Sequence, residues 1–324
     1  MPFRPAWWLP NRHVETLWGA LFRKPPAVPT TIERWALPDG DFIRIDRLPP
    51  AQPHAPHLVI AHGLEGSSHS PYVRGTLAQA HMRGWGASVL IFRGCGGELN
   101  TTRRFYHSGE TTDLDFVIQR TIDQHPASKI VVAGFSLGGN VVLKWLGEHS
   151  RELPSQVVAG AAVSVPFDLA RGARHIGQGF ARIYERNFLK TLRAKALQKM
   201  ATFPDLASRE AVLGARTIWD FDDVLTAPVH GFRDANDYYS RSSSLGFLGR
   251  INRPTLLLSA RNDPFLPPDV LLEVEREAER NSNLVLEFTE RGGHVGFAEG
   301  VSPFNAKYYA EWRVVDFLAP FLRG

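Results

Sequence analysis

The sequence predicts an α/β fold in which a mostly parallel central sheet carries helices on both faces. Short continuous apolar runs, typical of strands buried on both faces, recur along the 324-residue chain. Between them lie segments whose apolar residues recur at helical spacing; Leu114, Val117, Ile118 and Ile122 form one such set. Strands that alternate with helices in this way form parallel sheets.

The individual elements follow in chain order. Residues 31–37 and 42–47 are expected to form a hairpin, because Asp39-Gly40 is a strong turn signal between two β-prone runs. Further strands are expected over residues 57–61, 87–92, 129–134, 157–165, 254–260 and 284–289. Helices are expected over residues 72–83, 113–124, 140–148, 268–280 and 306–318. Residues 1–30 are interpreted as an arm that precedes the folded body.

The alternation of strands and helices stops at Pro166 and resumes at Pro254. Since the intervening stretch is helix-rich and irregular, it suits a cap inserted over an active site. We therefore expect residues 1–165 to be the arm and the first part of the core, residues 166–249 a helical cap insertion, and residues 250–324 the remainder of the core. The insertion carries many basic residues, which are interpreted as a solvated helix face. Attraction of anionic substrates or lipid surfaces is the alternative.

Composition limits the class of protein. Hydrophobic residues make up 44% of the chain, which argues against disorder, and the formal net charge of +4 is spread out, which argues against nucleic-acid binding. The single cysteine, Cys95, excludes a disulfide framework and a cysteine-based metal site, and a cytoplasmic location is expected. No metal and no cofactor are expected, because no phosphate-binding loop or metal-binding motif is found.

Membrane association is expected to be weak at most. No run of 18 apolar residues occurs, so no transmembrane helix is expected, and the N-terminus is a poor match to a signal peptide. The pair Trp7-Trp8 is expected to pack on the protein itself, with a membrane-surface contact as the alternative. The oligomeric state is left open.

The strongest chemical motif is Gly134-Phe-Ser136-Leu-Gly138, which lies between an expected strand and an expected helix. This is the context of a nucleophile elbow, where a sharp, strained turn exposes the serine hydroxyl. The residues two before and two after the serine must be small because the backbones crowd there. The helix N-terminus that follows favours developing negative charge. Ser136 is therefore the predicted nucleophile.

A serine of ordinary pKa needs an adjacent base. His294 is the candidate, because it lies in the glycine-rich run 292–296 after the last expected strand. Asp263 follows the expected strand over residues 254–260 and is the candidate acid, which would orient the imidazole. This assignment gives the chain order Ser, Asp, His. The rivals for the acid are Asp222, Asp223 and Asp269.

The run His62-Gly-Leu64-Glu-Gly66 follows another expected strand. Acyl transfer needs backbone amides that stabilise the negative oxygen of the tetrahedral intermediate. We expect the amides of Leu64 and Leu137 to form this oxyanion hole, with His62 supporting the loop through hydrogen bonds rather than acting as the base.

Taken together, these motifs resemble the YheT-like branch of the α/β-hydrolases, bacterial esterase-type proteins related to eukaryotic abhydrolase-domain lipases. The resemblance covers nearly the whole chain. It rests on the following runs: Asn11 to Trp18, His62 to Ser68 with Tyr72, Phe92 to Gly97, Gly134 to Asn140, and Phe221-Asp222 through Pro228 to Phe232. One departure is that Arg12 precedes His13, where such proteins usually have proline, which leaves the role of the arm open.

The resemblance implies a Ser/Asp/His triad and hydrolysis of carboxylic esters with short or medium acyl chains. The expected partner is thus a small ester or lipid substrate. Amide or thioester cleavage, or acyl transfer to an alcohol, is the alternative on the same scaffold. A catalytically idle binding protein is the alternative from another class.

Overall fold

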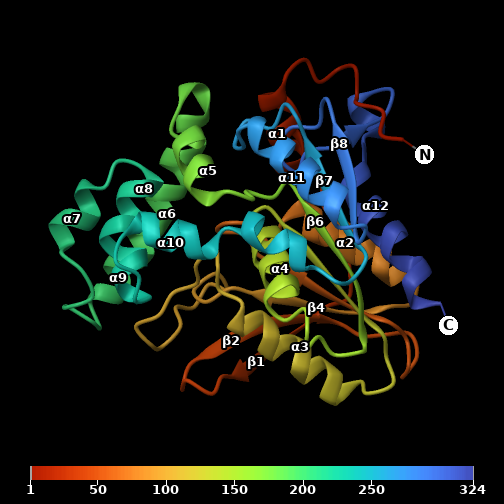
Figure 1. Cartoon of the computed structure of the whole chain (residues 1–324), viewed down its shortest axis with the longest axis horizontal. Coiled ribbons are helices and arrows are strands. Elements are labelled where there is room, and N and C mark those ends of the chain that lie inside the picture. Colours follow the sequence, from red (N-terminus) through yellow and green to blue (C-terminus); the bar gives the residue numbers. More distant parts are fainter. Residues whose placement is uncertain (1, 324) are drawn as a thin grey trace.

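A computed structural model describes residues 2–323 of the chain. Its centre is one eight-stranded sheet with the order β1-β2-β4-β3-β5-β6-β7-β8 (Figure 1). Strands β3 to β8 pair in parallel, whereas β1 and β2 pair antiparallel, so the predicted mostly parallel sheet is confirmed. The strands are β1 Thr31–Ala36, β2 Phe42–Leu48, β3 His57–Ala61, β4 Gly86–Ile91, β5 Ile130–Phe135, β6 Val157–Val163, β7 Thr255–Ala260 and β8 Leu284–Thr289. A small second sheet pairs β9 (Ala298–Glu299) with β10 (Lys307–Tyr308).

Helices cover both faces of the large sheet. On one face lie α3 (Thr112–Gln124), α4 (Leu137–Glu148) and α11 (Asp269–Arg280); on the other lie α2 (Pro71–Met82) and α12 (Tyr309–Leu318). Successive side chains of a strand point to opposite faces, so Val131 and Val132 of β5 enter different apolar clusters. This is why the central strands read as unbroken apolar runs.

Six α-helices lie in the chain between β6 and β7, and they gather at the left of Figure 1. They are α5 Leu169–Ile176, α6 Arg182–Met200, α7 Arg209–Gly214, α8 Ile218–Phe221, α9 Ala227–Val229 and α10 Ala235–Ser242. The interpretation of the basic residues as a solvated face is wrong for Lys199, which is 2% exposed. Its ammonium donates to Asn100 Oδ1 at 2.8 Å and to the Thr102 carbonyl at 2.7 Å, and so ties α6 to the loop after β4. Within residues 2–323, no helix is long and apolar enough to cross a membrane.

The arm contains a helix that the sequence analysis did not predict, α1 (Arg12–Phe22). Asn11 caps it, because its side chain accepts hydrogen bonds from the amides of His13 and Val14. Trp8 packs against Trp18 with 4.8 Å between ring centroids, as expected of a ring held on the protein itself. Its neighbour Trp7 is 76% exposed.

Two helix starts differ from the predictions by three residues, whereas the other predicted starts lie within one residue. Helix α4 begins at Leu137, directly after the elbow serine, rather than at residue 140, because packing overrides the weak helix propensity of two glycines. The last helix begins at Tyr309 rather than at residue 306, because Lys307 and Tyr308 pair with β9. The sequence pattern gives helix periodicity but not these tertiary constraints.

Asn140 on α4 joins the nucleophile helix to two distant segments. Its Nδ2 donates to the carbonyls of Ser108 and Ser242, both at 2.8 Å, and its Oδ1 accepts from the amide of Ser244 at 2.8 Å. The side chain is completely buried. The end of the helical insertion is thereby fixed against the helix that follows Ser136.

Replacing Asn140 with alanine should lower the free energy of unfolding by about 2–4 kcal/mol, because three buried polar groups lose their partner. Urea unfolding of Asn140→Ala beside the wild type checks this. Asn236→Ala is the matched control, since Asn236 is exposed on α10. Equal stability of the two variants would show that the three hydrogen bonds of Asn140 do not stabilise the fold.

Candidate active site

The predicted site residues follow the carboxyl ends of four strands. Leu64 comes after β3, Ser136 after β5, Asp263 after β7 and His294 after β8. Parallel strands bring their carboxyl ends to one edge of a sheet, where ligands of such folds bind. The structure places Ser136, Asp263 and His294 in one hydrogen-bonded row at this edge.

Ser136 lies on a strained turn. Its φ of 52° and ψ of −123° fall outside the regions that residues with a side chain favour. The flanking glycines are required by space. A Cβ on Gly134 would lie 2.2 Å from the Gly138 carbonyl oxygen, and a Cβ on Gly138 would lie 2.3 Å from that of Ala61. The turn is possible only because both positions lack a side chain.

His294 bridges the other two residues. Its Nδ1 lies 2.8 Å from Asp263 Oδ2, and its Nε2 lies 2.9 Å from Ser136 Oγ. An ionised carboxylate only accepts hydrogen bonds, so Nδ1 carries the proton of the neutral ring. Nε2 is then left to accept from the serine hydroxyl. Asp263 is 2% exposed, and its second oxygen accepts from the amide of Phe265 at 2.8 Å.

The backbone around His294 is also strained. Val295 has a φ of 57°, which is rare for a β-branched residue, and Ser164 has a φ of 52°. The Ser164 hydroxyl accepts from the Val295 amide at 3.0 Å and supports this conformation. The ring of Phe265 stacks on the imidazole, with 4.2 Å between centroids. The backbone next to His294 is thus fixed by a hydrogen bond, and one face of its ring is covered by Phe265.

The loop after β3 is built around His62. This side chain is completely buried; its Nε2 accepts from the Phe92 amide at 3.2 Å, and its Nδ1 lies 2.7 Å from the Gly63 carbonyl. Burial lowers the pKa of His62 to about 4, so the ring is neutral and donates from Nδ1. Both ring nitrogens of His62 are used by these hydrogen bonds to the backbone, so His62 supports the loop as expected.

Glu65 continues this loop with a φ of 55°. The hydroxyl of Tyr106 accepts from the Glu65 amide at 3.0 Å and donates to its carboxylate at 2.8 Å. Lys195 of α6 pairs with the same carboxylate at 2.8 Å. The expectation of a solvated face is therefore wrong for Lys195 as well, because it joins the helical insertion to the residue next to Leu64.

Two backbone amides of residues beside the site have no acceptor among residues 2–323. Within residues 2–323, the amides of Leu64 and Leu137 donate no hydrogen bond to the protein. Both residues line the same cavity as Ser136 and His294. Leu137 is the first residue of α4, where a helix leaves its amides unpaired.

The cavity has a volume of about 500 Å³, within the range of small-molecule sites. Most of its lining is apolar. The helical insertion and α1 both contribute to this lining, through residues that include Leu17, Ala20, Ile176, Phe188, Leu192 and Phe221. The Ser136 side chain therefore lines an apolar cavity whose walls come from the core, the helical insertion and α1.

The rival acids lie away from the histidine. Asp222 bonds to the hydroxyls of Thr226 and Tyr239, and Asp223 accepts from the Ala235 amide. Asp269 pairs with Arg171 at 3.5 Å and is 63% exposed. Asp222 is nevertheless buried beside the cavity, and this burial raises the pKa of its carboxyl to about 6.

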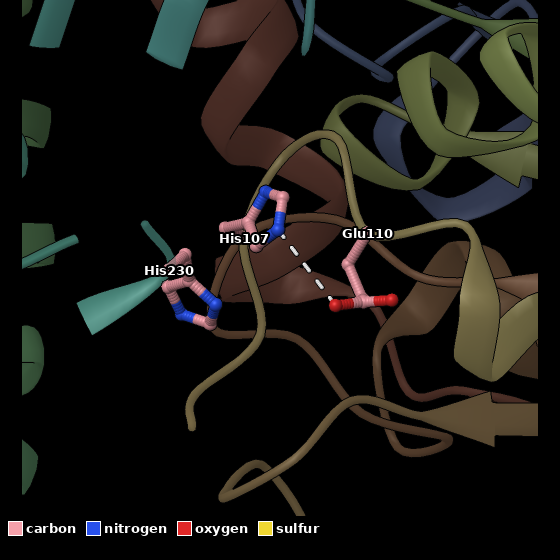
Figure 2. Close-up of side chains that lie close together, drawn as sticks. All are labelled: His107, Glu110 and His230. Atoms are coloured by element: carbon pink, nitrogen blue, oxygen red, sulfur yellow. Dashed lines mark ion pairs between the residues drawn. The ribbon is translucent and has the colours of Figure 1, made fainter. Parts of the chain in front are cut away.

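A second cluster, made of His107, Glu110 and His230, has the spacing of metal ligands (Figure 2). His107 Nε2 lies 3.7 Å from Glu110 Oε2. The same oxygen already pairs with the guanidinium of Arg104, and the other accepts from Thr112. The guanidinium of Arg104 therefore already neutralises the Glu110 carboxylate that a metal ion would bind. We interpret the cluster as a packing contact between the loop after β4 and the end of α9.

The strand order and the serine elbow define a class of protein. A family model described as the alpha/beta hydrolase fold matches residues 56–301, and the chain belongs to this family. Within the family, the protein is similar over nearly its whole length to Putative esterase YheT of Escherichia coli strain K12. The two sequences are 38% identical over 332 residues, which cover 99% of this chain and 94% of the relative.

Other relatives are more distant. A monoacylglycerol lipase of Saccharomyces cerevisiae is 31% identical over 265 residues, which cover 79% of this chain and 57% of the lipase. Among solved structures, the esterase Pf2001 of Pyrococcus furiosus aligns with a TM-score of 0.58 at 18% identity, over 92% of each chain. At this identity the likeness shows the fold alone. The predicted membership of the YheT-like branch is confirmed.

The pKa of Asp222 generates a prediction about stability. Between its ordinary pKa of 3.8 and about 6, the folded state keeps a proton that the unfolded state releases. The free energy of unfolding therefore falls as the pH rises through that window, because the buried Asp222 carboxyl must ionise in the folded protein. Asp222→Asn removes the buried charge, and both of its partners are hydroxyls that can reverse their hydrogen bonds.

The stability of Asp222→Asn relative to wild type should thus increase by up to about 3 kcal/mol between pH 4 and pH 7. Urea unfolding at both pH values measures the difference. The exposed Asp123→Asn serves as control. A relative stability of Asp222→Asn that does not change with pH would refute the assignment.

Proposed function

We propose that this protein is a serine hydrolase of carboxylic esters in which Ser136 is the nucleophile, His294 the base and Asp263 the acid. The observation that carries the proposal is the unbroken row from Ser136 Oγ through His294 to Asp263, with contacts of 2.9 and 2.8 Å. A hydroxyl on a strained elbow that is bonded to a neutral imidazole is the arrangement required of an activated serine.

In the proposed mechanism, Ser136 Oγ attacks the ester carbonyl while His294 Nε2 takes its proton. The imidazolium that forms is stabilised by Asp263. The amides of Leu64 and Leu137, which donate to no acceptor in the described part of the chain, stabilise the tetrahedral oxyanion. The alcohol leaves with the proton from His294, and an acyl group stays on Ser136. Water then attacks the acyl-enzyme while His294 Nε2 takes its proton. The second tetrahedral intermediate collapses, the carboxylic acid leaves, and Ser136 Oγ regains its proton from His294.

The proposed substrate is an ester with a short or medium acyl chain. The apolar lining of the 500 Å³ cavity supports a hydrocarbon chain, and residues 166–249 act as the cap that encloses it. Relatives named esterase and lipase favour esters over amides as the substrate class. An idle binding protein is disfavoured, because all three members of the row are in place.

Ser136→Ala should reduce ester hydrolysis by roughly 10⁶-fold, the loss typical when the nucleophile of such a unit is removed. Hydrolysis of p-nitrophenyl esters from acetate to palmitate measures the rate and locates the preferred chain length. A fluorophosphonate probe should label the wild type and leave Ser136→Ala unlabelled. A variant that keeps the wild-type rate would eliminate Ser136 as the nucleophile.

Asp263→Asn should lower kcat by about 10⁴-fold, because an amide can hold the imidazole in the wrong tautomer. Asp269→Asn is the matched control and should keep kcat within about twofold, since Asp269 is exposed and, among residues 2–323, forms an ion pair with Arg171 alone. If both substitutions had the same effect, the acid would have to be sought elsewhere.

A further inference from the structure

The run Asn11 to Trp18 belongs to the features that place the chain in its family, yet the proposed reaction gives it no role. It forms the start of α1, which lies almost 280 residues from His294 in the sequence. In space, however, α1 contacts both loops that carry the proposed acid and base. The inference drawn from these contacts rests on the proposed function.

Glu15 of α1 ties these two loops together. It is 3% exposed, although a carboxylate is rarely buried without partners. Its Oε2 accepts from Asn262 Nδ2 at 2.7 Å and from the Gly292 amide at 3.2 Å. Its Oε1 pairs with the guanidinium of Arg291 at 2.7 Å. Asn262 immediately precedes Asp263, so one buried carboxylate holds the loop after β7 and the loop after β8.

Thr16 contacts the base itself. Its hydroxyl accepts from the backbone amide of His294 at 2.9 Å, and it donates to the Arg12 carbonyl at 2.7 Å. The preceding amide, that of Gly293, donates to Asn262 Oδ1 at 3.0 Å. Three consecutive amides, of residues 292 to 294, are therefore bonded either to α1 or to the asparagine that α1 holds.

The glycines beside His294 reflect the same packing. A Cβ on Gly293 would lie 2.7 Å from Thr16 Oγ1, and a Cβ on Gly296 would lie 2.3 Å from the carbonyl oxygen of Glu15. Real Cβ atoms do not approach so closely, so these positions require glycine for α1 to sit where it does. The start of α1 and the glycine-rich run 292–296, far apart in the sequence, thus pack closely against each other.

We infer that α1 is the positioning element of the reaction. Glu15 and Thr16 are positioning residues that hold the backbone of His294 relative to Asp263 and Ser136. Thr16 also lines the cavity, but its hydroxyl bonds to the Arg12 carbonyl and the His294 amide rather than to a reacting atom. A misplacement of about 1 Å at a catalytic group can reduce the rate about 10²-fold without weakening substrate binding. The effect of losing these contacts should therefore appear in kcat rather than in KM.

The experiment compares Thr16→Val, which is similar in shape but has no hydroxyl, with Thr16→Ser, which keeps one. Thr16→Val should lower kcat roughly 10- to 100-fold with KM within about twofold, and Thr16→Ser should restore most of the rate. Thr191→Val is the matched control, because Thr191 also donates to a carbonyl of the preceding helical turn, at 2.9 Å, but is exposed on α6. Rates are measured well below the melting temperature of each variant.

A kcat of Thr16→Val equal to that of wild type and of Thr191→Val would overturn the inference. So would an equal loss in Thr16→Val and Thr16→Ser, because the hydroxyl would then not be the cause. If Thr16→Val does not fold, Glu15→Gln replaces it. Glu15→Gln keeps the size of the side chain, and a kcat loss without a KM change supports the inference, whereas an unchanged kcat overturns it.

A measurement on the resting protein separates this inference from the proposed function. The proton that we place on His294 Nδ1, shared with Asp263 across 2.8 Å, should give a low-field proton resonance in NMR spectra. In Thr16→Val this resonance should shift or broaden relative to wild type and Thr16→Ser. If wild type cleaves no ester, the proposed function fails, and the resonance still decides the inference. A resonance identical in all three proteins would overturn the positioning role.

Discussion

The hydrogen bond from His294 to Asp263 is the interaction on which the rest of the site depends. It determines that Nδ1 carries the ring proton and that Nε2 faces the Ser136 hydroxyl at 2.9 Å. Everything else in the site maintains this row: the strained elbow presents the serine, the stacked ring of Phe265 covers the imidazole, and α1 holds the loops. Ser136 and Val295 keep their strained backbone conformations because the residues packed around them hold the backbone in place.

The helical insertion is coupled to the chemistry by charge as well as by shape. Lys195 of α6 pairs with Glu65, the residue next to a proposed oxyanion donor, and Lys199 one turn later enters the loop after β4. Both contacts are largely shielded from solvent. The insertion therefore forms the cavity wall in a defined position against the core, and its basic residues serve internal contacts as well as solvation.

The sequence predicts most of the sheet and the places of Ser136, Asp263 and His294, because apolar runs mark strands and these residues follow them. Helix α1 was missed, although Asn11 is a recognisable cap at its start. The partners of Glu15 could not be predicted, since its contacts span about 250 to 280 residues and no local pattern reports them. Local signals give elements and motifs; they do not say which distant loop a polar side chain reaches.

The dependence of the site on α1 has a consequence for biosynthesis. A ribosome adds about 5–20 residues per second, so roughly 15–60 s separate the emergence of α1 from that of the loop that bears His294. For most of this interval the carboxylate of Glu15 has none of its final partners, because Asn262, Arg291 and Gly292 all come late in the chain. Leu9, which is 0% exposed in the finished protein, lacks Ala298 and Tyr308 of its apolar cluster over the same period. The nascent chain thus carries an unpaired N-terminal segment that a chaperone would find accessible. The backbone of His294 reaches its final support only when α1 meets the loop after β8.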